Sequence, residues 1–299
     1  MGGVLSEQAG LLNILSIVFP VFAIVLAGWA YGRRREVEMT ASNQLNMDLF
    51  VPALVFSALA DQSFELAGHQ WLALGAFLMI AGSGVAAWAL ARTAAISPKV
   101  LVPALMFNNC GNLGLPLAAL AFGQQGLTAG VVMFLVSNLM HFSFGIWLLD
   151  HHARWWNLWR NPVILGAAAG LAVSFYGIAL WPPLQLAIRM LGEVSIPLAL
   201  VALGVRIAQS RVAHMRAGLV GGMARPAIGI LLSWLLARLL GLEGEQQAML
   251  IMFGALPPAM INYVFAERYR QGPEQMAAIV LTGNLLAVPV IPLVLALVL

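Results

Sequence analysis

The sequence has little charge and almost no cysteine. Only 9% of its 299 residues are Asp, Glu, Lys or Arg, whereas 61% are hydrophobic. A water-soluble domain carries about 25% charged residues, so this chain lacks the charge to cover a water-facing surface. The net charge of +3 is too small to indicate a nucleic-acid partner. These shortages exclude a soluble domain and predict an integral membrane protein that has the lipid bilayer as its surroundings.

Recognisable catalytic and metal-binding patterns are also missing. The single cysteine, Cys110, excludes an internal disulfide and a cysteine-rich metal site. The sequence contains no phosphate-binding loop, no Gly-x-Ser-x-Gly elbow and no His-Glu-x-x-His pair. We interpret the run Asp150-His151-His152 as a loop beside a belt of interfacial tryptophans rather than as a metal site. We therefore expect no enzymatic activity, no cofactor and no metal.

The sequence contains instead a series of long apolar runs. Each is about 20 residues long, the length of a transmembrane helix, and none shows the short alternating pattern of a membrane β-barrel. We predict an all-α membrane protein with about ten transmembrane helices and short connections. The predicted spans cover residues 11–32, 41–60, 70–91, 99–122, 127–149, 161–181, 185–207, 216–239, 246–267 and 275–298.

The second half of the chain repeats features of the first half. At an offset of 146 positions, Trp88 and Arg92 are matched by Trp234 and Arg238. Each half holds five predicted spans, and an odd number inverts the second half relative to the first. Inverted repeats are typical of secondary transporters. The predicted repeats cover residues 1–150 and 151–299.

The basic residues are distributed unevenly between the connections. The connections after the odd-numbered spans hold 12 of the 15 arginines and lysines. By the positive-inside rule these connections are cytoplasmic, and both termini then lie outside the cell. The 12 residues are Arg33, Arg34, Arg35, Arg92, Lys99, Arg154, Arg160, Arg206, Arg211, Arg216, Arg268 and Arg270.

An octapeptide interrupts the fourth predicted span. It reads Asn109-Cys110-Gly111-Asn112-Leu113-Gly114-Leu115-Pro116. Gly111 and Gly114 can adopt backbone angles that other residues resist, and Pro116 removes a hydrogen-bond donor. Non-helical backbone at membrane depth persists only beside a cavity or other protein. We expect a half-helix to begin near Pro116 and to direct its free N–H groups at an anion, with the asparagines as amide donors. The alternative is a kink packed against a neighbouring helix.

A second interruption lies in the ninth predicted span. It reads Leu256-Pro257-Pro258-Ala259-Met260-Ile261-Asn262. Pro257 and Pro258 are expected to free carbonyl groups one turn earlier, and Asn262 falls opposite Pro116 in the repeat. Tyr263 follows, either to contact a ligand or to lie at the membrane interface. Two broken spans at corresponding positions of two halves predict a transporter binding site.

Other polar residues lie within predicted spans. Asp48 and Glu193 each precede a proline by one turn, and acids within the membrane are often functional. We expect them to serve in coupling or gating, or in structural contacts at an interface. Arg225 is expected either to act on an anionic ligand or to form a structural ion pair. Asn138 and Asn284, which match in the repeat, are predicted to line or brace the interruptions.

Two of these motifs resemble those of a known family. The pattern Asn109-x-Gly111-x-x-Gly114-x-Pro116 is similar to the broken fourth helix of the auxin efflux carrier family. The run Ala255-Leu256-Pro257-x-x-x-x-Asn262-Tyr263-Val264-Phe265-Ala266-Glu267-Arg268-Tyr269 resembles its ninth helix. Asn262 stands where plant carriers have a proline, and the long cytoplasmic loop of many plant members is absent. The chain therefore resembles the bacterial branch of the family.

The resemblance implies a function and an organisation for the whole chain. It implies secondary transport of a small organic carboxylate by elevator-type alternating access, with the asparagines of the two interruptions holding the substrate. It also implies a scaffold of spans 1, 2, 6 and 7 and a moving bundle of spans 3–5 and 8–10. The expected assembly is a homodimer in the bacterial inner membrane.

Two other transport functions stay open at this point. A carrier resembling the bile-acid/sodium symporters would be coupled to a cation, and its transport would stop when choline replaced sodium. A passive anion channel would show flux that does not saturate and no uphill accumulation. The residues also leave open whether a proton, a sodium ion or neither is the coupling partner.

Overall fold

The computed structural model describes residues 2–60, 66–150, 160–209 and 214–299 of the chain. Within these ranges the secondary structure is helical and contains no β-strand. Three π-helical turns are η1 (Asn46–Phe50), η2 (Cys110–Gly114) and η3 (His141–Gly145). The α-helices are α1 (Gly2–Arg34), α2 (Thr40–Leu45), α3 (Val51–Leu59), α4 (Leu66–Ala94), α5 (Pro98–Met106), α6 (Leu115–Met140), α7 (Ile146–Leu149), α8 (Pro162–Phe175), α9 (Pro182–Gln209), α10 (Met215–Leu239), α11 (Gly244–Ala255), α12 (Ile261–Arg268) and α13 (Pro273–Val298).

The described part of the chain contains six helical segments that are long and apolar enough to cross a membrane. Together with the composition, they confirm the prediction of a helical integral membrane protein. The other predicted spans coincide with shorter or interrupted helices, so the number of ten crossings stays a prediction. The six segments are Leu15–Arg34, Gly68–Ala94, Cys110–Leu149, Pro182–Gln209, Met215–Leu239 and Pro273–Val298.

The fourth and fifth predicted spans meet at a kink instead of a separate loop. At Gly123, within α6, φ is 66° and ψ is −153°. A positive φ of this kind favours glycine, which has no Cβ. A Cβ at Gly123 would meet no atom within 4 Å, so the requirement for glycine comes from the backbone angles alone. One residue therefore joins the two predicted spans.

Two short helices, α5 and α11, form the interior of the molecule. Every residue from Val100 to Met106 in α5 is buried, and so is every residue from Ala248 to Ala255 in α11. A helix that is apolar on all sides belongs in the interior. Each of these helices ends where the chain is interrupted, so the two interruptions lie in the core.

Helices α1 and α9 pack with their backbones in direct contact. A Cβ on Gly204 of α9 would collide with the carbonyl oxygen of Val25 in α1, and a Cβ on Gly28 would collide with that of Val201. Small residues at a membrane helix interface permit this close approach. A side chain at either glycine would force α1 and α9 apart.

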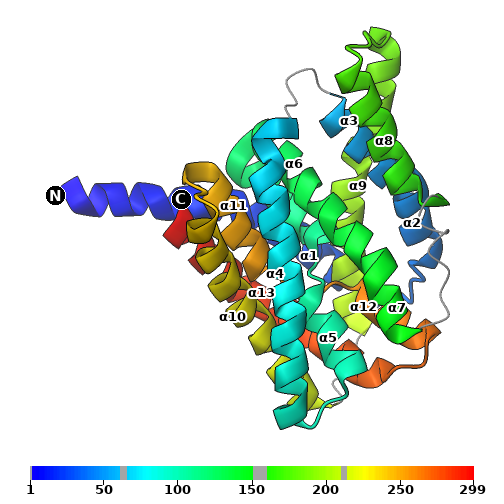
Figure 1. Ribbon diagram of the computed structural model, residues 1–299, viewed down its shortest axis with the longest axis vertical. Helices are drawn as coiled ribbons and strands as arrows, with labels where there is room; N and C mark the ends of the chain where they lie inside the picture. Colours follow the sequence, from blue (N-terminus) through cyan, green and yellow to red (C-terminus); the bar gives the residue numbers. More distant parts are fainter. Residues whose placement is uncertain (1, 61–65, 151–159, 210–213) are drawn as a thin grey trace.

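The remaining helices pack into two groups. In one group α3 contacts α8 and α9, and in the other α10 contacts α4, α11 and α13. Figure 1 shows α4, α10 and α11 on one side of the view and α3 and α8 on the other. The C-terminus lies on the same side of that view as the projecting start of α1. The predicted sixth and seventh spans correspond to α8 and α9.

Two of the π-helical turns directly precede a proline. The turn η1 ends two residues before Pro52, and η2 ends two residues before Pro116. Proline has no N–H and its ring clashes with the carbonyl group four residues earlier. A π turn widens the helix at that point and accommodates both effects. The prolines thus account for turns that apolar periodicity does not predict.

Candidate functional site

The two interruptions pair with each other through their backbones. The Asn109 N–H donates to the Pro257 carbonyl at 2.7 Å, and the Ala259 N–H donates to the Phe107 carbonyl at 2.9 Å. These bonds form an isolated antiparallel bridge between Asn108 and Pro258. Buried backbone groups need hydrogen-bond partners. Each interruption therefore supplies the partners that the other has lost from its helix.

Asparagine side chains extend this pairing in both directions. Asn108 Nδ2 donates to the Phe253 carbonyl at 2.6 Å, and Asn262 Nδ2 donates to the Phe107 carbonyl at 3.0 Å. Both asparagines are buried, and within the described residues neither Oδ1 has a partner. Proline at 257 leaves the Phe253 carbonyl without its α-helical donor, as predicted, and Asn108 takes that place. These amide groups therefore hold the two interruptions together.

Asn284 of α13 links both interruptions. Its Oδ1 accepts a hydrogen bond from Asn109 Nδ2 at 3.2 Å, and its Nδ2 donates to the Pro258 carbonyl at 3.3 Å. A third bond joins Nδ2 to the Val280 carbonyl one turn earlier, at 2.8 Å. The neighbouring Gly283 packs against the Pro258 ring, where a Cβ would leave no room. The bracing that the sequence predicted for Asn284 is present.

The half-helix after the first interruption begins earlier than predicted. We expected its start near Pro116, but helical backbone begins at Cys110, with Asn109 preceding it at φ −80° and ψ 53°. The Leu113 and Gly114 N–H groups both donate to the Asn109 carbonyl at 3.1 Å. The expectation was wrong because a π turn accommodates Pro116 without ending the helix. The unpaired first N–H groups thus belong to residues 110–112.

The glycines of the octapeptide act through their size. The sequence suggested unusual backbone angles, but neither glycine has a positive φ. A Cβ on Gly111 would lie 2.9 Å from Phe134 Cε2, and one on Gly114 would lie 2.8 Å from Leu256 Cδ1. The expectation about angles was wrong because the π turn keeps helical geometry. Both glycines provide space for close packing, Gly114 against the second interruption.

A cavity of about 770 Å³ opens beside the first interruption. Asn109, Gly111 and Asn112 line it together with Asn138. Asn112 is half-buried in this wall. Asn138 donates to the Phe134 carbonyl of its own helix at 3.0 Å. The other boundary is formed by residues after α1 and by α9, including Glu36, Glu38, Thr40, Ser195, Ala202 and Gln209.

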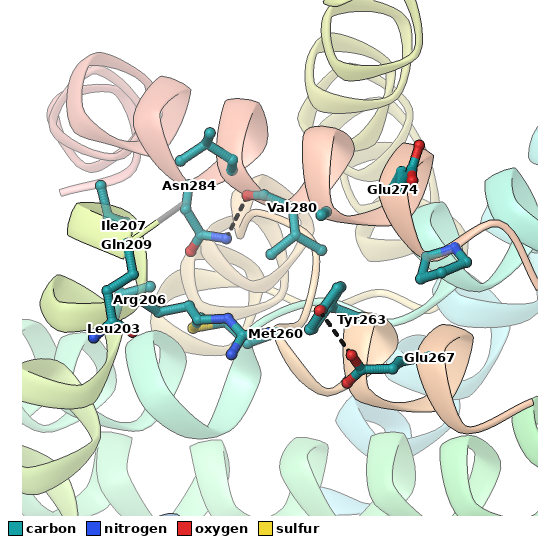
Figure 2. Close-up of a pocket in the computed structure, with 13 residues that line it drawn as sticks. Leu203, Arg206, Ile207, Gln209, Met260, Tyr263, Glu267, Glu274, Val280 and Asn284 are labelled. Atoms are coloured by element: carbon teal, nitrogen blue, oxygen red, sulfur yellow. Dashed lines mark hydrogen bonds between the residues drawn. The ribbon is translucent and has the colours of Figure 1, made fainter. Parts of the chain in front are cut away.

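A second cavity of about 700 Å³ lies on the other side of α12. Tyr263 and Asn284 line it, and Figure 2 shows these side chains between α9, α12 and α13. The two cavities share four lining residues: Arg206, Gln209, Met260 and Glu267. We call these four residues the neck. The remaining predicted residues of the interruptions, Gly114, Pro116, Pro257, Pro258 and Asn262, line neither cavity and lie behind the cavity walls.

Two residues of the neck, Arg206 and Glu267, are connected through Tyr263. The Arg206 guanidinium carbon lies 4.2 Å from the centre of the Tyr263 ring. The Tyr263 hydroxyl bonds to Glu267 Oε1 at 3.1 Å, one turn further along α12. Arg206 belongs to α9 and the other two residues to α12, so this contact joins α9 to α12.

Arg225 is fully buried next to the second interruption. Its Nη1 donates to the Gly254 carbonyl at 3.2 Å, the second carbonyl that the prolines free. Its Nε and Nη2 have no partner among the described residues, and no acid there pairs with it. The structural ion pair considered from the sequence is therefore absent from the described chain. Arg225 lines neither cavity and places a positive charge behind the interruptions.

The two predicted coupling acids lie away from the interruptions. Asp48 in η1 and Glu193 in α9 are exposed, and neither lines a cavity. Glu193 accepts a hydrogen bond from Arg189 Nε at 3.1 Å in an exposed pair within one helix. His151 and His152 lie outside the described residues. In the part of the chain that is described, no cluster of His, Cys, Asp or Glu could hold a metal ion.

Arg206 and His141 are among the cavity residues that were not predicted to bind the substrate. Arg206 follows a long apolar run and was interpreted only as a cytoplasmic arginine. His141 is buried, stacks on Phe107 with ring centres 4.0 Å apart and packs edge-on against Phe265 at 5.2 Å. Its spacing of one turn from Asn138 was the only signal that could have placed it in the cavity wall.

Comparison with known proteins agrees with the membrane location. A family model described as "Membrane transport protein" matches residues 13–154 and 146–295. The chain is 25% identical to a protein of Rhizobium meliloti named "Putative malonate transporter", over 92% of this chain and 93% of that protein. It is also 25% identical to an "Uncharacterized transporter" of Methanothermobacter thermautotrophicus, over 92% of this chain and 95% of that protein. The chain therefore belongs to the membrane transport protein family, which is the auxin efflux carrier family predicted from its motifs.

Proposed function

We propose that this protein is a secondary transporter that moves a small organic carboxylate across the membrane by elevator-type alternating access. The proposed architecture has ten spans in two inverted repeats, residues 1–150 and 151–299. The two interruptions are then a crossover of the fourth and ninth spans. Membership of a membrane transport family supports the general function. The name of the Rhizobium meliloti relative makes malonate the first substrate to test.

The observation that carries the proposal is the start of a half-helix at the cavity wall. The first N–H groups of η2 belong to residues 110–112, and all three residues line the cavity. Unpaired N–H groups and the positive end of the helix dipole favour an anion. The Asn112 amide adds a neutral donor beside them. A carboxylate fits this arrangement because its oxygens accept several hydrogen bonds at once.

The buried charge of Arg225 supports the same choice of substrate. No acid of the described chain neutralises it, and it lies behind the crossover at the Gly254 carbonyl. Coulomb interactions weaken less with distance in a poorly polarisable interior than in water. We assign Arg225 the role of holding a positive potential at the anion site without touching the substrate.

The packing of the helices supports a scaffold and a moving bundle. We assign α1, α3, α8 and α9 to the scaffold and α4, α5, α10, α11 and α13 to the bundle, together with the crossover. The close backbone contact of α1 and α9 suits a rigid scaffold. The cavity lies between residues of both parts, so a shift of the bundle would carry the crossover past α9.

The position of the cavities supports an inward-facing state. Their walls include Glu36, Gln209, Glu267 and Glu274, which lie at helix ends that the positive-inside rule assigns to the cytoplasm. In this orientation both termini face out of the cell and the membrane is the bacterial inner membrane. The family resemblance favours a homodimer built through the scaffold. Among Asp48, Glu193 and Glu267, only Glu267 lines a cavity, which makes it the acid best placed for proton coupling.

Uptake into proteoliposomes tests the proposal. We expect the purified protein to accumulate radiolabelled malonate with saturable kinetics, and Asn112→Ala and Asn109→Ala to reduce this uptake at least tenfold. Asn43→Ala, in the opposite cavity wall, is the matched control and is expected to stay within twofold. Replacing sodium by choline and imposing a pH gradient separate sodium coupling, proton coupling and uniport. Unchanged uptake in both crossover variants would remove the crossover as the binding site, and non-saturating flux would indicate a channel.

A further inference from the structure

Arg206 occupies a special position among the charged residues. Among the described residues that line the two cavities, it is the only arginine or lysine. It contributes to both cavity walls from the last turn of α9, and Figure 2 shows its side chain reaching toward Met260 and Tyr263. A ligand passing along either cavity to the crossover therefore meets this one guanidinium.

The guanidinium also shares the larger cavity with residues 110–112 of the first interruption. Tyr263, on whose ring it stacks, directly follows Asn262, and Asn262 donates to the Phe107 carbonyl inside the crossover. A guanidinium carries its N–H donors in one plane. Planar donors of this type match the two oxygens of a carboxylate.

Several acids line the cavities around the neck, so the charge of Arg206 is needed to offset their repulsion of an anion. Glu36, Glu38 and Glu267 line the larger cavity, and Glu267 and Glu274 line the smaller one. A doubly charged anion would be repelled from such a mouth without a compensating cation. The Tyr263 hydroxyl donates to Glu267 Oε1 at 3.1 Å, which fixes this carboxylate beside the ring at the cavity wall.

We propose that Arg206 binds the second carboxylate of a short dicarboxylate substrate whose first carboxylate is held at the crossover. The inference rests on the function proposed above and narrows its substrate class from carboxylates to dicarboxylates. Arg206 is the residue that distinguishes a dicarboxylate from a monocarboxylate of the same size. Tyr263 and Glu267 are positioning residues, because they orient the guanidinium and do not themselves bind the substrate.

Malonate and propionate are matched probes because both have three carbons and differ in one carboxylate. Isothermal titration of the purified full-length protein measures both affinities. Hydrogen bonds to charged groups contribute about 1.5–3 kcal/mol, which corresponds to about tenfold or more in affinity. We expect Arg206→Gln to weaken malonate binding by at least this factor and to change propionate binding less than about threefold. Arg206→Lys keeps the positive charge but lacks the planar set of N–H donors, so we expect its malonate affinity to lie between those of the wild type and Arg206→Gln.

Two further variants separate positioning from folding. Tyr263→Phe keeps the stacked ring but removes the bond to Glu267, and we expect it to lower the malonate-to-propionate affinity ratio while the melting temperature stays unchanged. Arg216→Gln, an exposed arginine at the start of α10 that lines neither cavity, is the control and is expected to leave the ratio unchanged. If Arg206→Gln does not fold, Arg206→Lys gives the same comparison of ratios.

The outcomes distinguish this inference from the proposed function. Equal losses for malonate and propionate in Arg206→Gln, or no loss for either, overturn the assignment of Arg206. If the wild-type protein transports malonate and only the Asn109 and Asn112 variants lose it, the crossover site stands and the Arg206 inference fails alone. A wild-type protein that neither binds nor transports any carboxylate overturns both.

Discussion

Asn109 and Asn284 are bonded side chain to side chain, although 175 positions separate them in the sequence. Asn284 also donates to the Pro258 carbonyl of the other interruption. A single residue of α13 therefore bonds to both chain segments, which the backbone bridge and the amides of Asn108 and Asn262 also join. Its removal is expected to affect both interruptions at once.

Asn284→Ala leaves the Asn109 amide and the Pro258 carbonyl without this partner in a buried position. An unsatisfied buried polar group costs about 1–3 kcal/mol, so we expect a clearly lower melting temperature in detergent and little uptake. Asn138→Ala is the control, because among the described residues Asn138 bonds only to a carbonyl of its own helix. Equal melting temperatures for the two variants would contradict the linking role of Asn284.

Gly229→Ala tests the contact between α10 and α11. The added methyl group would overlap the Gly254 carbonyl oxygen and the Arg225 guanidinium. Overpacking of this kind costs about 1–3 kcal/mol, so we expect a lower melting temperature and a disturbed second interruption. Gly68→Ala in α4 adds a methyl group with no atom within 4 Å and is expected to cause no loss. A stable Gly229→Ala variant would show that the two helices can separate freely.

Arg225→Gln tests whether the charge or the hydrogen bond of Arg225 matters. Glutamine can still donate to the Gly254 carbonyl, and removing an unpaired buried charge relieves a desolvation cost of several kcal/mol. We expect the melting temperature to stay equal or to rise, while the affinity for malonate falls about tenfold as the positive potential is lost. Arg225→Lys should retain more affinity than Arg225→Gln. Full malonate affinity in the glutamine variant would exclude an electrostatic role.

Pro116→Ala tests the origin of the π turn at the cavity wall. Alanine restores an N–H group that can donate to the carbonyl four residues earlier, so we expect η2 to tighten into an α-helix. This change would rotate residues 110–112 relative to the cavity and reduce uptake, although the helix itself becomes more regular. Pro98→Ala is the control, because Pro98 lies in the first turn of α5, where its N–H has no helical partner. Normal uptake in Pro116→Ala would mean that the π turn is dispensable.

The long helices could be predicted from the sequence, whereas the hydrogen-bond partners of the polar residues could not. Residues 216–239 were expected to span the membrane, and α10 covers Met215–Leu239, because an uninterrupted apolar run has few alternatives. The second interruption was found because two adjacent prolines remove helical hydrogen bonds. The start of the half-helix within the octapeptide was predicted too late, because a π turn competes with a break at Pro116. Local sequence does not distinguish these outcomes.

The asparagines were expected at the substrate, but most of their amide groups bond to protein. Asn108 and Asn262 bond to carbonyls 145 and 155 positions away, and such partners cannot be identified from spacing along one helix. Arg206 was missed for a related reason. A cytoplasmic arginine that orients a membrane helix and one that faces a cavity look alike in sequence, and only the contact of Arg206 with the Tyr263 ring and the cavity walls distinguishes them.

The backbone contact between α1 and α9 determines where motion can be observed. Because no side chain separates Gly204 from Val25, we expect α1 and α9 to move together as one rigid unit. Spectroscopic labels placed one on α1 and one on α9 should keep a constant separation throughout a transport cycle. A label on α9 paired with one on α12 would instead cross the neck, and the proposed elevator motion predicts that this separation changes during transport.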